Sequence, residues 1–415
     1  MSFVPNKLKN LASNLGVMNV ARKYYLKKYY ENLEDKFHEY KKLGKVPMPD
    51  TLIWEPTGKC NLRCRMCYIN FAVTTKVREM TLDEFKIMIN KIPSLKKIMM
   101  IGGELFLRKD IFDMLEFLKE KEILATVATN ATLLKPEMIE KLAEYKDMTN
   151  VTVSVDGPEK IHNQIRGKEF AFQRSMENIK EMRKKGLFVN VVSVITKENI
   201  DYFPDLIKVI KESGANYMEL EYERIYNAEI VKKTSEILGI PHTLDNFPIV
   251  GTDNSLMPEY TIERLRISMD AAENMAKKVG MTVGYMPFDF KENLEDYYHR
   301  STETDREHFC KHLFIPRIDC SGNFIFCFAI KKPMGNILTQ NFEEVWYGEE
   351  FNRFRDTFLN NKVLPICETC EKMVICKKSD KKVNPQEKIE TIQIKADDGD
   401  HKIEEAYETV YAGNN

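Results

Sequence analysis

The chain has 415 residues and a formal net charge of −1, because 62 lysines and arginines are balanced by 63 aspartates and glutamates. This balance argues against a dedicated nucleic-acid-binding protein, which needs a basic face, so we expect no nucleic-acid partner. No stretch reaches ~18 consecutive apolar residues and the nine cysteines are too sparse for a disulfide framework, so the composition indicates a globular cytoplasmic protein whose clustered cysteines form metal or redox sites.

A basic segment, residues 1–48, opens the sequence. Its first ten residues lack the apolar region of a signal peptide. Apolar residues recur at helical spacing and four tyrosines follow among lysines: Leu8, Leu11, Leu15 and Met18, then Tyr24, Tyr25, Tyr29 and Tyr30. The pattern has two interpretations, a helix packed on the main domain with a solvated lysine face, or a helix that makes peripheral contact with a membrane surface or a partner.

Residues 49–305 alternate between short apolar runs and helical patterns. Six Val-, Ile- and Met-rich runs predict strands covered on both faces: Leu52–Glu55, Lys97–Ile101, Leu124–Ala128, Val151–Val155, Val189–Ile195 and Tyr217–Tyr222. Thr81–Glu84 has the form of a helix-starting capping box, and a further helix is predicted from Thr261 to about Val279, before a strand-like run at Met281–Tyr285. The alternation predicts a parallel α/β sheet, either doubly wound or a barrel.

The remaining sequence divides into a cysteine-bearing module, residues 306–380, and a tail, residues 381–415. The module contains short strand-like runs and six of the nine cysteines. The tail is polar and acidic, and we expect it to be flexible.

Three cysteines follow the first predicted strand within eight residues: Cys60, Cys64 and Cys67. The carboxyl end of a strand is where α/β folds place their chemistry. Three thiolates do not complete a tetrahedral zinc site, and no fourth ligand lies nearby in the sequence. A cubane iron–sulfur cluster can be held by three cysteines, which leaves one iron open to another molecule. Incomplete zinc ligation and chance clustering are the alternatives.

The loop from Cys60 to Cys67, with apolar Met66 before the last cysteine, resembles the signature of the radical S-adenosylmethionine (SAM) superfamily. The resemblance implies that the three cysteines hold a 4Fe–4S cluster whose open iron chelates the amino and carboxylate groups of SAM. An external donor of the flavodoxin or ferredoxin type would supply one electron, the S–C5′ bond would break, and the resulting 5′-deoxyadenosyl radical would take a hydrogen from the substrate. It also implies a partial (β/α)6 TIM-like barrel and a low-oxygen setting.

Two further motifs follow in the order of that family. Gly102, Gly103 and Glu104 come after the second predicted strand and resemble the motif that binds the SAM amino group, with Leu105 in place of the usual proline. Glycines permit close approach of the backbone to a ligand, and a carboxylate complements an ammonium. Asn130, after Thr129, ends the third predicted strand and resembles the family's Thr-Asn-Gly, with alanine in place of the glycine.

The fourth predicted strand ends in Ser154-Val-Asp156-Gly, which His162 and Arg166 follow. This stretch resembles one common in members with a C-terminal cluster domain. The likeness implies that Ser154 and Arg166 bind the carboxylate or ribose of SAM, and the planar fork of an arginine suits a carboxylate. For Asp156 a turn cap, and for His162 a structural hydrogen bond, are equally good interpretations.

The six remaining cysteines resemble the SPASM/twitch extension of radical SAM enzymes, which carries one or two auxiliary 4Fe–4S clusters: Cys310, Cys320, Cys327, Cys367, Cys370 and Cys376. Two clusters need eight ligands, and Asp380 stands where a further cysteine would be. One cluster of Cys310, Cys327, Cys367 and Cys370, two clusters with a non-cysteine ligand, and a cluster with an open iron are the alternatives, and zinc suits the spacing as well. We favour two clusters with incomplete cysteine ligation.

The motifs say little about the substrate, and no catalytic residue is assigned. Phe328 stands where sulfatase-modifying members have an aspartate base, which disfavours that reaction. Glu219, Glu221 and Tyr222 near the sixth strand's end are hypotheses for substrate contact, and an exposed strand end is the alternative. The sequence predicts oxidation or bond formation on a peptide, protein or small metabolite. A lipid or membrane-bound substrate, and a non-catalytic iron–sulfur electron carrier, are the other hypotheses.

Overall fold

The computed structural model describes residues 17–67, 77–224, 226–248, 261–287, 294–298, 307–359 and 363–376. All of them belong to one compact unit, Met1–Cys376. The second unit, Lys377–Asn415, lies outside the described residues, and the predicted flexible tail and Asp380 lie there with it. Leu8, Leu11 and Leu15 of the predicted N-terminal helix also lie outside them.

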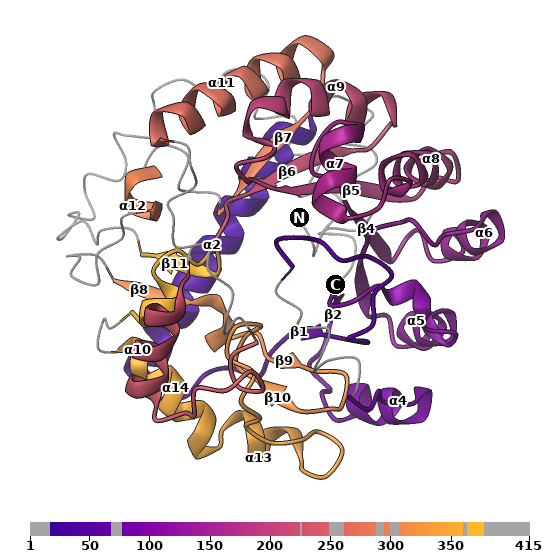
Figure 1. The fold of residues 1–415 in the computed structure, drawn as a ribbon. Coiled ribbons are helices and arrows are strands. Elements are labelled where there is room, and N and C mark those ends of the chain that lie inside the picture. The colour runs from indigo at the N-terminus through magenta and orange to yellow at the C-terminus, as the bar shows by residue number, and fades with distance from the viewer. Residues whose placement is uncertain are drawn as a thin grey trace, which may run out of the picture. The chain divides into compact units, whose positions relative to one another are not determined.

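Seven parallel strands form the wall of a partial barrel (Figure 1). Each strand pairs with the next along the chain. The six predicted strands and the partial barrel are confirmed, and the strand-like run before Pro287 is a seventh strand of the same sheet. The strands are β1 (Thr51–Trp54), β2 (Lys97–Met100), β3 (Leu124–Thr129), β4 (Thr149–Ser154), β5 (Phe188–Val194), β6 (Tyr217–Glu221) and β7 (Val283–Met286).

Helices connect these strands and cover the outer face of the sheet (Figure 1). The capping box is confirmed, because the Thr81 hydroxyl accepts from the Glu84 N–H at 3.3 Å and the Glu84 carboxylate accepts from the Thr81 N–H at 2.9 Å. The helices are α4 (Leu82–Asn90), η1 (Leu105–Leu107), α5 (Ile111–Glu120), α6 (Pro136–Ala143), α7 (Glu159–Arg166), α8 (Ala171–Lys184), η2 (Ile200–Tyr202), α9 (Phe203–Glu212), α10 (Ala228–Leu238), α11 (Ile262–Val279) and α12 (Leu294–Tyr298).

The cysteine-bearing module continues the barrel sheet. Its strand β9 pairs in parallel with β1 and in antiparallel with β10, while β8 and β11 form a separate antiparallel pair. The predicted boundary at residue 305 therefore does not interrupt the hydrogen bonding of the sheet. The elements are β8 (His308–Cys310), η4 (Lys311–Leu313), β9 (Arg317–Ile318), β10 (Phe324–Ile325), α13 (Phe342–Trp346), α14 (Glu349–Leu359), η5 (Pro365–Cys367) and β11 (Met373–Ile375).

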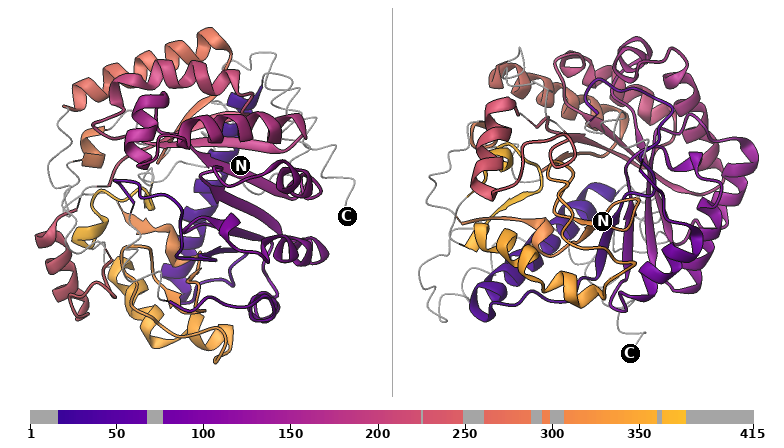
Figure 2. Two further views of the ribbon diagram at one scale, coloured as in Figure 1. Left: turned by 45° about the vertical axis from the view of Figure 1, so that its right-hand side comes forward. Right: turned by 60° about the horizontal axis from the view of Figure 1, so that its bottom comes forward.

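The N-terminal helix α2 (Met18–Leu43) crosses the barrel diagonally, from beside β7 to beside β8 and β11 (Figures 1 and 2). Near its start Arg22 pairs with Glu219 of β6 at 2.5 Å. Near its end the Phe37 ring stacks on Phe309 of β8 with centroids 4.4 Å apart. The interpretation as a helix packed on the main domain is confirmed. Among the described residues, no helix is long and apolar enough to cross a membrane.

Candidate active site

The loop of three cysteines begins just beyond the carboxyl end of β1, as predicted. The N–H of Leu62 donates to the Cys60 sulfur at 3.4 Å, and the N–H of Cys67 donates to the Cys64 carbonyl at 3.2 Å. The three thiols are half-buried and form no disulfide. Burial raises the pKa of the Cys60 thiol. The loop therefore presents three thiols from one short segment, as a cluster with an open iron requires.

The backbone after β2 lies directly against the segment that leads into this loop. The N–H of Gly103 donates to the Thr57 carbonyl at 2.9 Å, and the N–H of Glu104 donates to the Lys59 carbonyl at 2.8 Å. A Cβ on Gly103 would lie 2.0 Å from the Lys59 carbonyl oxygen. Gly102 has φ +127, which an L side chain rarely adopts. Both glycines are therefore required by the backbone that positions Cys60.

We expect Gly103→Ala to reduce SAM cleavage by about 100-fold, because a displacement of about 1 Å at reacting groups has an effect of this size. Release of 5′-deoxyadenosine by the anaerobically reconstituted protein measures the effect. Gly44→Ala is the matched control, since a Cβ at Gly44 (φ +67) would meet nothing within 4 Å. The control is expected to lower stability by ~1 kcal/mol without slowing SAM cleavage. Equal rates for the two variants would contradict this role of Gly103.

Glu104 is 1 % exposed and joins the turn after β2 to the turn after β3. Its carboxylate accepts from the Thr129 hydroxyl at 2.7 Å, from the Asn130 N–H at 2.8 Å and from the Phe106 N–H at 3.3 Å. Burial raises the pKa of Glu104, and these hydrogen bonds oppose the rise. A carboxylate has about four acceptor positions, so one remains for a ligand such as an ammonium.

Asn130 lies beside the cysteine loop. Its amide nitrogen is 3.0 Å from the Asn61 side-chain oxygen and 3.9 Å from the Cys60 sulfur. Ala131, which stands where the resembled motif has glycine, adopts φ +59. Alanine at this position thus keeps the left-handed conformation that a glycine would adopt easily. The Thr129 hydroxyl oxygen accepts a hydrogen bond from the Ala131 N–H at 2.8 Å, which stabilises the turn.

Arg166 links the end of β4 to the cysteine loop. Its Nε donates to Asp156 at 2.5 Å and its guanidinium also donates to the Cys64 sulfur at 3.4 Å. Burial opposes the charged form, but Asp156 raises the pKa of Arg166. Asp156 is fully buried and also accepts the Val194 N–H at 3.2 Å. From the sequence alone, a turn cap explains Asp156 equally well, and its spacing to Arg166 is the one signal of this pairing.

The neighbouring predictions differ in outcome. His162 accepts the Asp156 N–H through Nδ1 at 3.1 Å, so it makes the structural hydrogen bond. Ser154 is the last residue of β4 and is half-buried. Alternation places it on the same face as Thr152, which lines the interior of the barrel. Its contact with SAM stays a prediction.

The structure divides the six C-terminal cysteines into two groups. In the first group, burial and then the charges of the Cys370 and Cys327 thiols raise the pKa of the Cys310 thiol well above its usual value, which indicates that these three thiols are near one another. Cys367 lies in the same turn as Cys370, whose N–H donates to the Cys367 carbonyl at 3.2 Å. Buried thiols that repel one another's charge fit a cationic metal centre between them.

Cys320 and Cys376 have other surroundings. Burial and then Asp319 and Glu55 raise the pKa of Cys320 to about 12. The sulfur of Cys376 and the side-chain ligand atoms of Glu34 and His38 on α2 lie within 4.8 Å of one another. Neither cysteine has another cysteine among the charged groups that shift its pKa.

The three residues that the sequence suggests for substrate contact are buried or half-buried, so they do not form an exposed strand end. Glu219 is 9 % exposed and pairs with Arg22, and Tyr222 is 1 % exposed. Glu221 is half-buried and lies 3.7 Å from the Lys372 ammonium. Phe328 lies under the guanidinium of Arg224, whose carbon is 3.9 Å from the ring centroid.

Family models match the two parts of the chain that carry these cysteines. Residues 54–210 match the radical SAM superfamily, and residues 310–371 match the SPASM iron–sulfur cluster-binding domain. These matches confirm the cofactors that the resemblance implied, SAM and 4Fe–4S clusters. The number of auxiliary clusters stays open.

Curated relatives are similar in sequence to part of this chain. An AdoMet-dependent heme synthase of Methanosarcina barkeri is 32 % identical over 170 residues, 40 % of this chain and 48 % of that protein. The antilisterial bacteriocin subtilosin biosynthesis protein AlbA of Bacillus subtilis is 27 % identical over 175 residues, 41 % of this chain and 39 % of that protein. The chain spans about half the length, or less, of the curated relatives it matches.

Solved structures share the fold. Streptococcus suis SuiB bound to precursor peptide SuiA superposes with a TM-score of 0.58 at 16 % identity, over 78 % of this chain and 70 % of that one. Native anSMEcpe with bound AdoMet superposes with a TM-score of 0.55 at 17 % identity, over 74 % of this chain and 83 % of that one. Together with the family models, the barrel and its cysteine loop show that this chain belongs to the radical SAM superfamily and carries a C-terminal SPASM domain.

Proposed function

We propose that this chain reductively cleaves SAM and removes a hydrogen atom from a peptide, protein or small-metabolite substrate, which leads to oxidation or bond formation. The observation that carries the proposal is the loop of three cysteines after β1. The backbone of the glycine turn after β2 donates hydrogen bonds to the segment that leads into this loop, and the guanidinium of Arg166 donates to the Cys64 sulfur. When bound, the reduced cluster and SAM supply a 5′-deoxyadenosyl radical, the species that takes the hydrogen.

The residues of this chain would position the cluster and SAM for that chemistry. Glu104 holds the turns after β2 and β3 in place and offers its remaining acceptor position to the SAM ammonium. Asp156 fixes Arg166, so that the guanidinium stays at the Cys64 sulfur. There Arg166 would bind the carboxylate or ribose of SAM. Ser154 ends β4 and Asn130 directly follows β3, so both stand at the carboxyl edge of the sheet, where they would contact SAM.

The substrate class rests on two kinds of similarity. SuiB is solved with a precursor peptide and AlbA is a biosynthesis protein of the bacteriocin subtilosin, which favour a peptide. The heme synthases favour a small molecule. An external donor of the flavodoxin or ferredoxin type supplies the electron for this reaction, in a low-oxygen cytoplasm. A membrane-bound substrate has less support, because Tyr25, Tyr29 and Tyr30 line the interior of the barrel.

An anaerobic reaction with dithionite and SAM tests the proposal. An enzyme of this kind releases 5′-deoxyadenosine, which chromatography detects, whereas a non-catalytic electron carrier with intact clusters releases none. Substrate identity requires a separate search among candidate peptides and metabolites.

We further propose one auxiliary cluster, held by Cys310, Cys327, Cys367 and Cys370, in place of the two clusters that the cysteine count favoured. Cys370→Ala is then expected to lower the iron content by up to about four atoms per chain. Cys320→Ala is the matched control, with unchanged iron, since Cys320 lies beside Asp319 and Glu55. Iron analysis of the reconstituted variants measures both. A loss of iron in Cys320→Ala as large as in Cys370→Ala would contradict the single cluster.

A further inference from the structure

The carboxyl-terminal part of α2 packs against the pair of strands β8 and β11. The Phe37 ring stacks on Phe309 of β8 with centroids 4.4 Å apart. Cys376 directly follows β11 and Glu307 directly precedes β8, and the Cys376 N–H donates to the Glu307 carbonyl at 2.9 Å. This hydrogen bond extends the antiparallel pairing by one residue beyond the two strands. Residues of α2, of the start of β8 and of the end of β11 therefore meet at one place.

Three side chains at this place carry atoms that bind metal ions: the carboxylate of Glu34, the imidazole of His38 and the thiol of Cys376. Their ligand atoms all lie within 4.8 Å of one another. Glu34 and His38 are four positions apart on α2, so they lie on the same face of the helix. Cys376 comes from a segment more than 330 positions later in the chain. The fold thus brings an oxygen, a nitrogen and a sulfur ligand together from two distant segments.

The spacing of these atoms suits a tetrahedral zinc ion. Zinc binds cysteine sulfur, histidine nitrogen and carboxylate oxygen, and with bonds of ~2.0–2.3 Å its neighbouring ligand atoms lie ~3.3–3.6 Å apart. Small rotations of the three side chains are enough to reach this spacing from separations of at most 4.8 Å. A fourth ligand is close, because a Glu307 carboxylate oxygen lies 3.5 Å from the His38 Nε2. Lys41 also pairs with Glu307 and holds that carboxylate at this place.

The surroundings of Cys376 differ from those of a cysteine that only fills the core. Its side chain is buried, with 3 % of the residue exposed, as a small apolar core residue would be. Burial and then the charges of Glu34 and Glu307 raise the pKa of its thiol to about 12, so two carboxylates lie near the sulfur. Such a set of groups attracts a cation, and a thiol that coordinates a metal ion is deprotonated outright. No other cysteine is among the groups that shift this pKa, which separates Cys376 from the thiols near Cys310.

We propose that Glu34, His38 and Cys376 bind a zinc ion, with the Glu307 carboxylate as the fourth ligand, and that this ion fastens α2 to the end of β11. Four protein ligands leave no position for a substrate, so the site is structural. The ligands come together only in the folded chain, so the free energy of zinc binding stabilises this packing of α2. The site is separate from the iron–sulfur clusters and does not depend on SAM cleavage.

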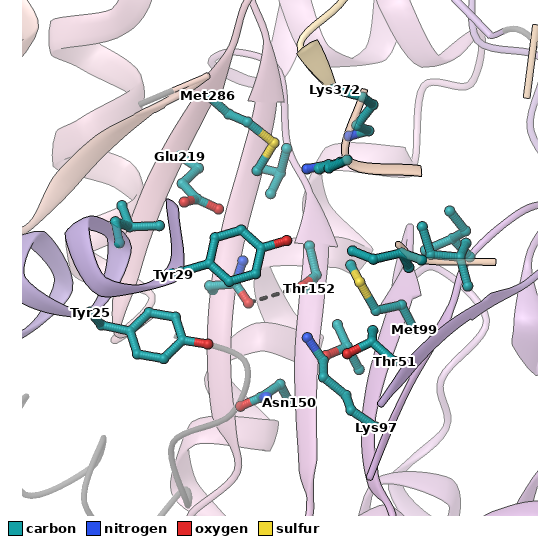
Figure 3. Close-up of a pocket in the computed structure, with 18 of the residues that line it drawn as sticks. Tyr25, Tyr29, Thr51, Lys97, Met99, Asn150, Thr152, Glu219, Met286 and Lys372 are labelled. Atoms are coloured by element: carbon teal, nitrogen blue, oxygen red, sulfur yellow. Dashed lines mark hydrogen bonds between the residues drawn. The ribbon is translucent and has the colours of Figure 1, made fainter. Parts of the chain in front are cut away.

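The zinc ion would also fix one wall of the barrel interior. The amino-terminal half of α2 borders a cavity of about 240 Å³ inside the barrel (Figure 3). Figure 3 shows Tyr25 and Tyr29 of α2 reaching toward the strand residues Lys97 and Asn150. His38 lies ~14 Å beyond Tyr29 along the same continuous helix, at ~1.5 Å per residue. An ion that holds His38 therefore also holds the tyrosines at this wall.

Titration of the reconstituted holoenzyme with zinc, against a zinc-binding indicator, tests the site while the cluster cysteines hold iron. We expect one zinc ion to bind tightly per chain. His38→Ala and Cys376→Ala are each expected to weaken zinc binding at least about 100-fold, since loss of a residue that only orients a metal ligand already costs about 10–100-fold. Cobalt(II) in place of zinc is expected to add a sulfur-to-metal charge-transfer absorption to the difference spectrum, which Cys376→Ala abolishes. The iron content of both variants is expected to equal that of the wild type.

The matched controls are His242→Ala and Cys320→Ala, because His242 is exposed and neither residue belongs to the ligand group. Both are expected to bind zinc as the wild type does. The His38 side chain is 51 % exposed, so His38→Ala is expected to fold even if the buried Cys376 does not tolerate replacement.

Three results overturn the proposal: no tight zinc binding by the wild type, wild-type affinity in His38→Ala, or cobalt binding without the sulfur absorption. Loss of iron from Cys376→Ala also overturns it, because this thiol would then belong to an auxiliary cluster. Zinc and iron are measured directly, so failure of this site and failure of the proposed function give different results.

Discussion

Replacing Cys60, Cys64 and Cys67 by alanine is expected to abolish the release of 5′-deoxyadenosine from SAM. The three thiols are the only cysteines in the described part of the barrel wall and its loops before residue 305. Without them no open iron remains for the SAM amino and carboxylate groups. The measurement is an anaerobic assay with dithionite and SAM, followed by chromatography.

The same triple variant also shows whether the auxiliary centre is independent. Its iron content is expected to fall by about four atoms per chain, and the visible absorbance of the auxiliary cluster is expected to remain. Cys320→Ala is a cysteine control with unchanged cleavage, because Cys320 lies beside Asp319 and outside both groups of thiols. Residual 5′-deoxyadenosine release by the triple variant at the wild-type rate would contradict the assignment of the cluster to the β1 loop.

Asp156→Asn is expected to destabilise the protein by ~3–5 kcal/mol, because removing one partner of a buried ion pair leaves the other charge uncompensated. Asp156 is fully buried, and its partner Arg166 has only 9 % of its surface exposed. Denaturant unfolding of the metal-free protein measures the loss without a contribution from cluster binding. In the holoenzyme the variant is also expected to slow SAM cleavage, since Arg166 would no longer be held at the Cys64 sulfur.

The matched control for this prediction is Asp201→Asn. Asp201 pairs with Arg264 on the surface, where both side chains are about half exposed. An exposed pair contributes about 0–1 kcal/mol, so the control is expected to change the free energy of unfolding very little. Similar losses for Asp156→Asn and Asp201→Asn would show that the buried pair does not hold the turn after β4.

Local patterns predicted most of the barrel. Apolar runs gave all six strands to within about two residues, because strands covered on both faces are apolar on both faces. The Thr81 capping box and the helix after Thr261 were read from residues three and four apart, which contact one another within the helix. The turn at Ala131 was also predictable, although alanine stands where the resembled Thr-Asn-Gly motif has glycine, the residue that usually marks such a turn.

Contacts between distant segments were not predictable in the same way. The pairing of β9 with β1 joins residues more than 250 positions apart, and no local pattern specifies it. Arg22 of α2 meets Glu219 only because the helix crosses the barrel. The grouping of Cys310 with Cys370 likewise depends on how the module folds, so the number of cysteines in the sequence favoured two clusters while their positions favour one.

The placement of the tyrosines changes how the basic N-terminus is understood. Their presence among lysines suggested a membrane surface, but Tyr25 and Tyr29 face the interior cavity. Their rings and Arg22 instead form one wall of this cavity. The lysines therefore lie on the solvated face of α2, and the tyrosines Tyr25 and Tyr29 lie on its inward face.

The most direct test of the central claim is the amount of 5′-deoxyadenosine formed when the reconstituted wild-type protein is incubated with SAM and dithionite in the absence of oxygen. The account predicts release of 5′-deoxyadenosine that depends on both dithionite and SAM, and none from the triple variant at Cys60, Cys64 and Cys67. Wild-type protein with its full complement of iron that binds SAM and forms no 5′-deoxyadenosine would contradict the account.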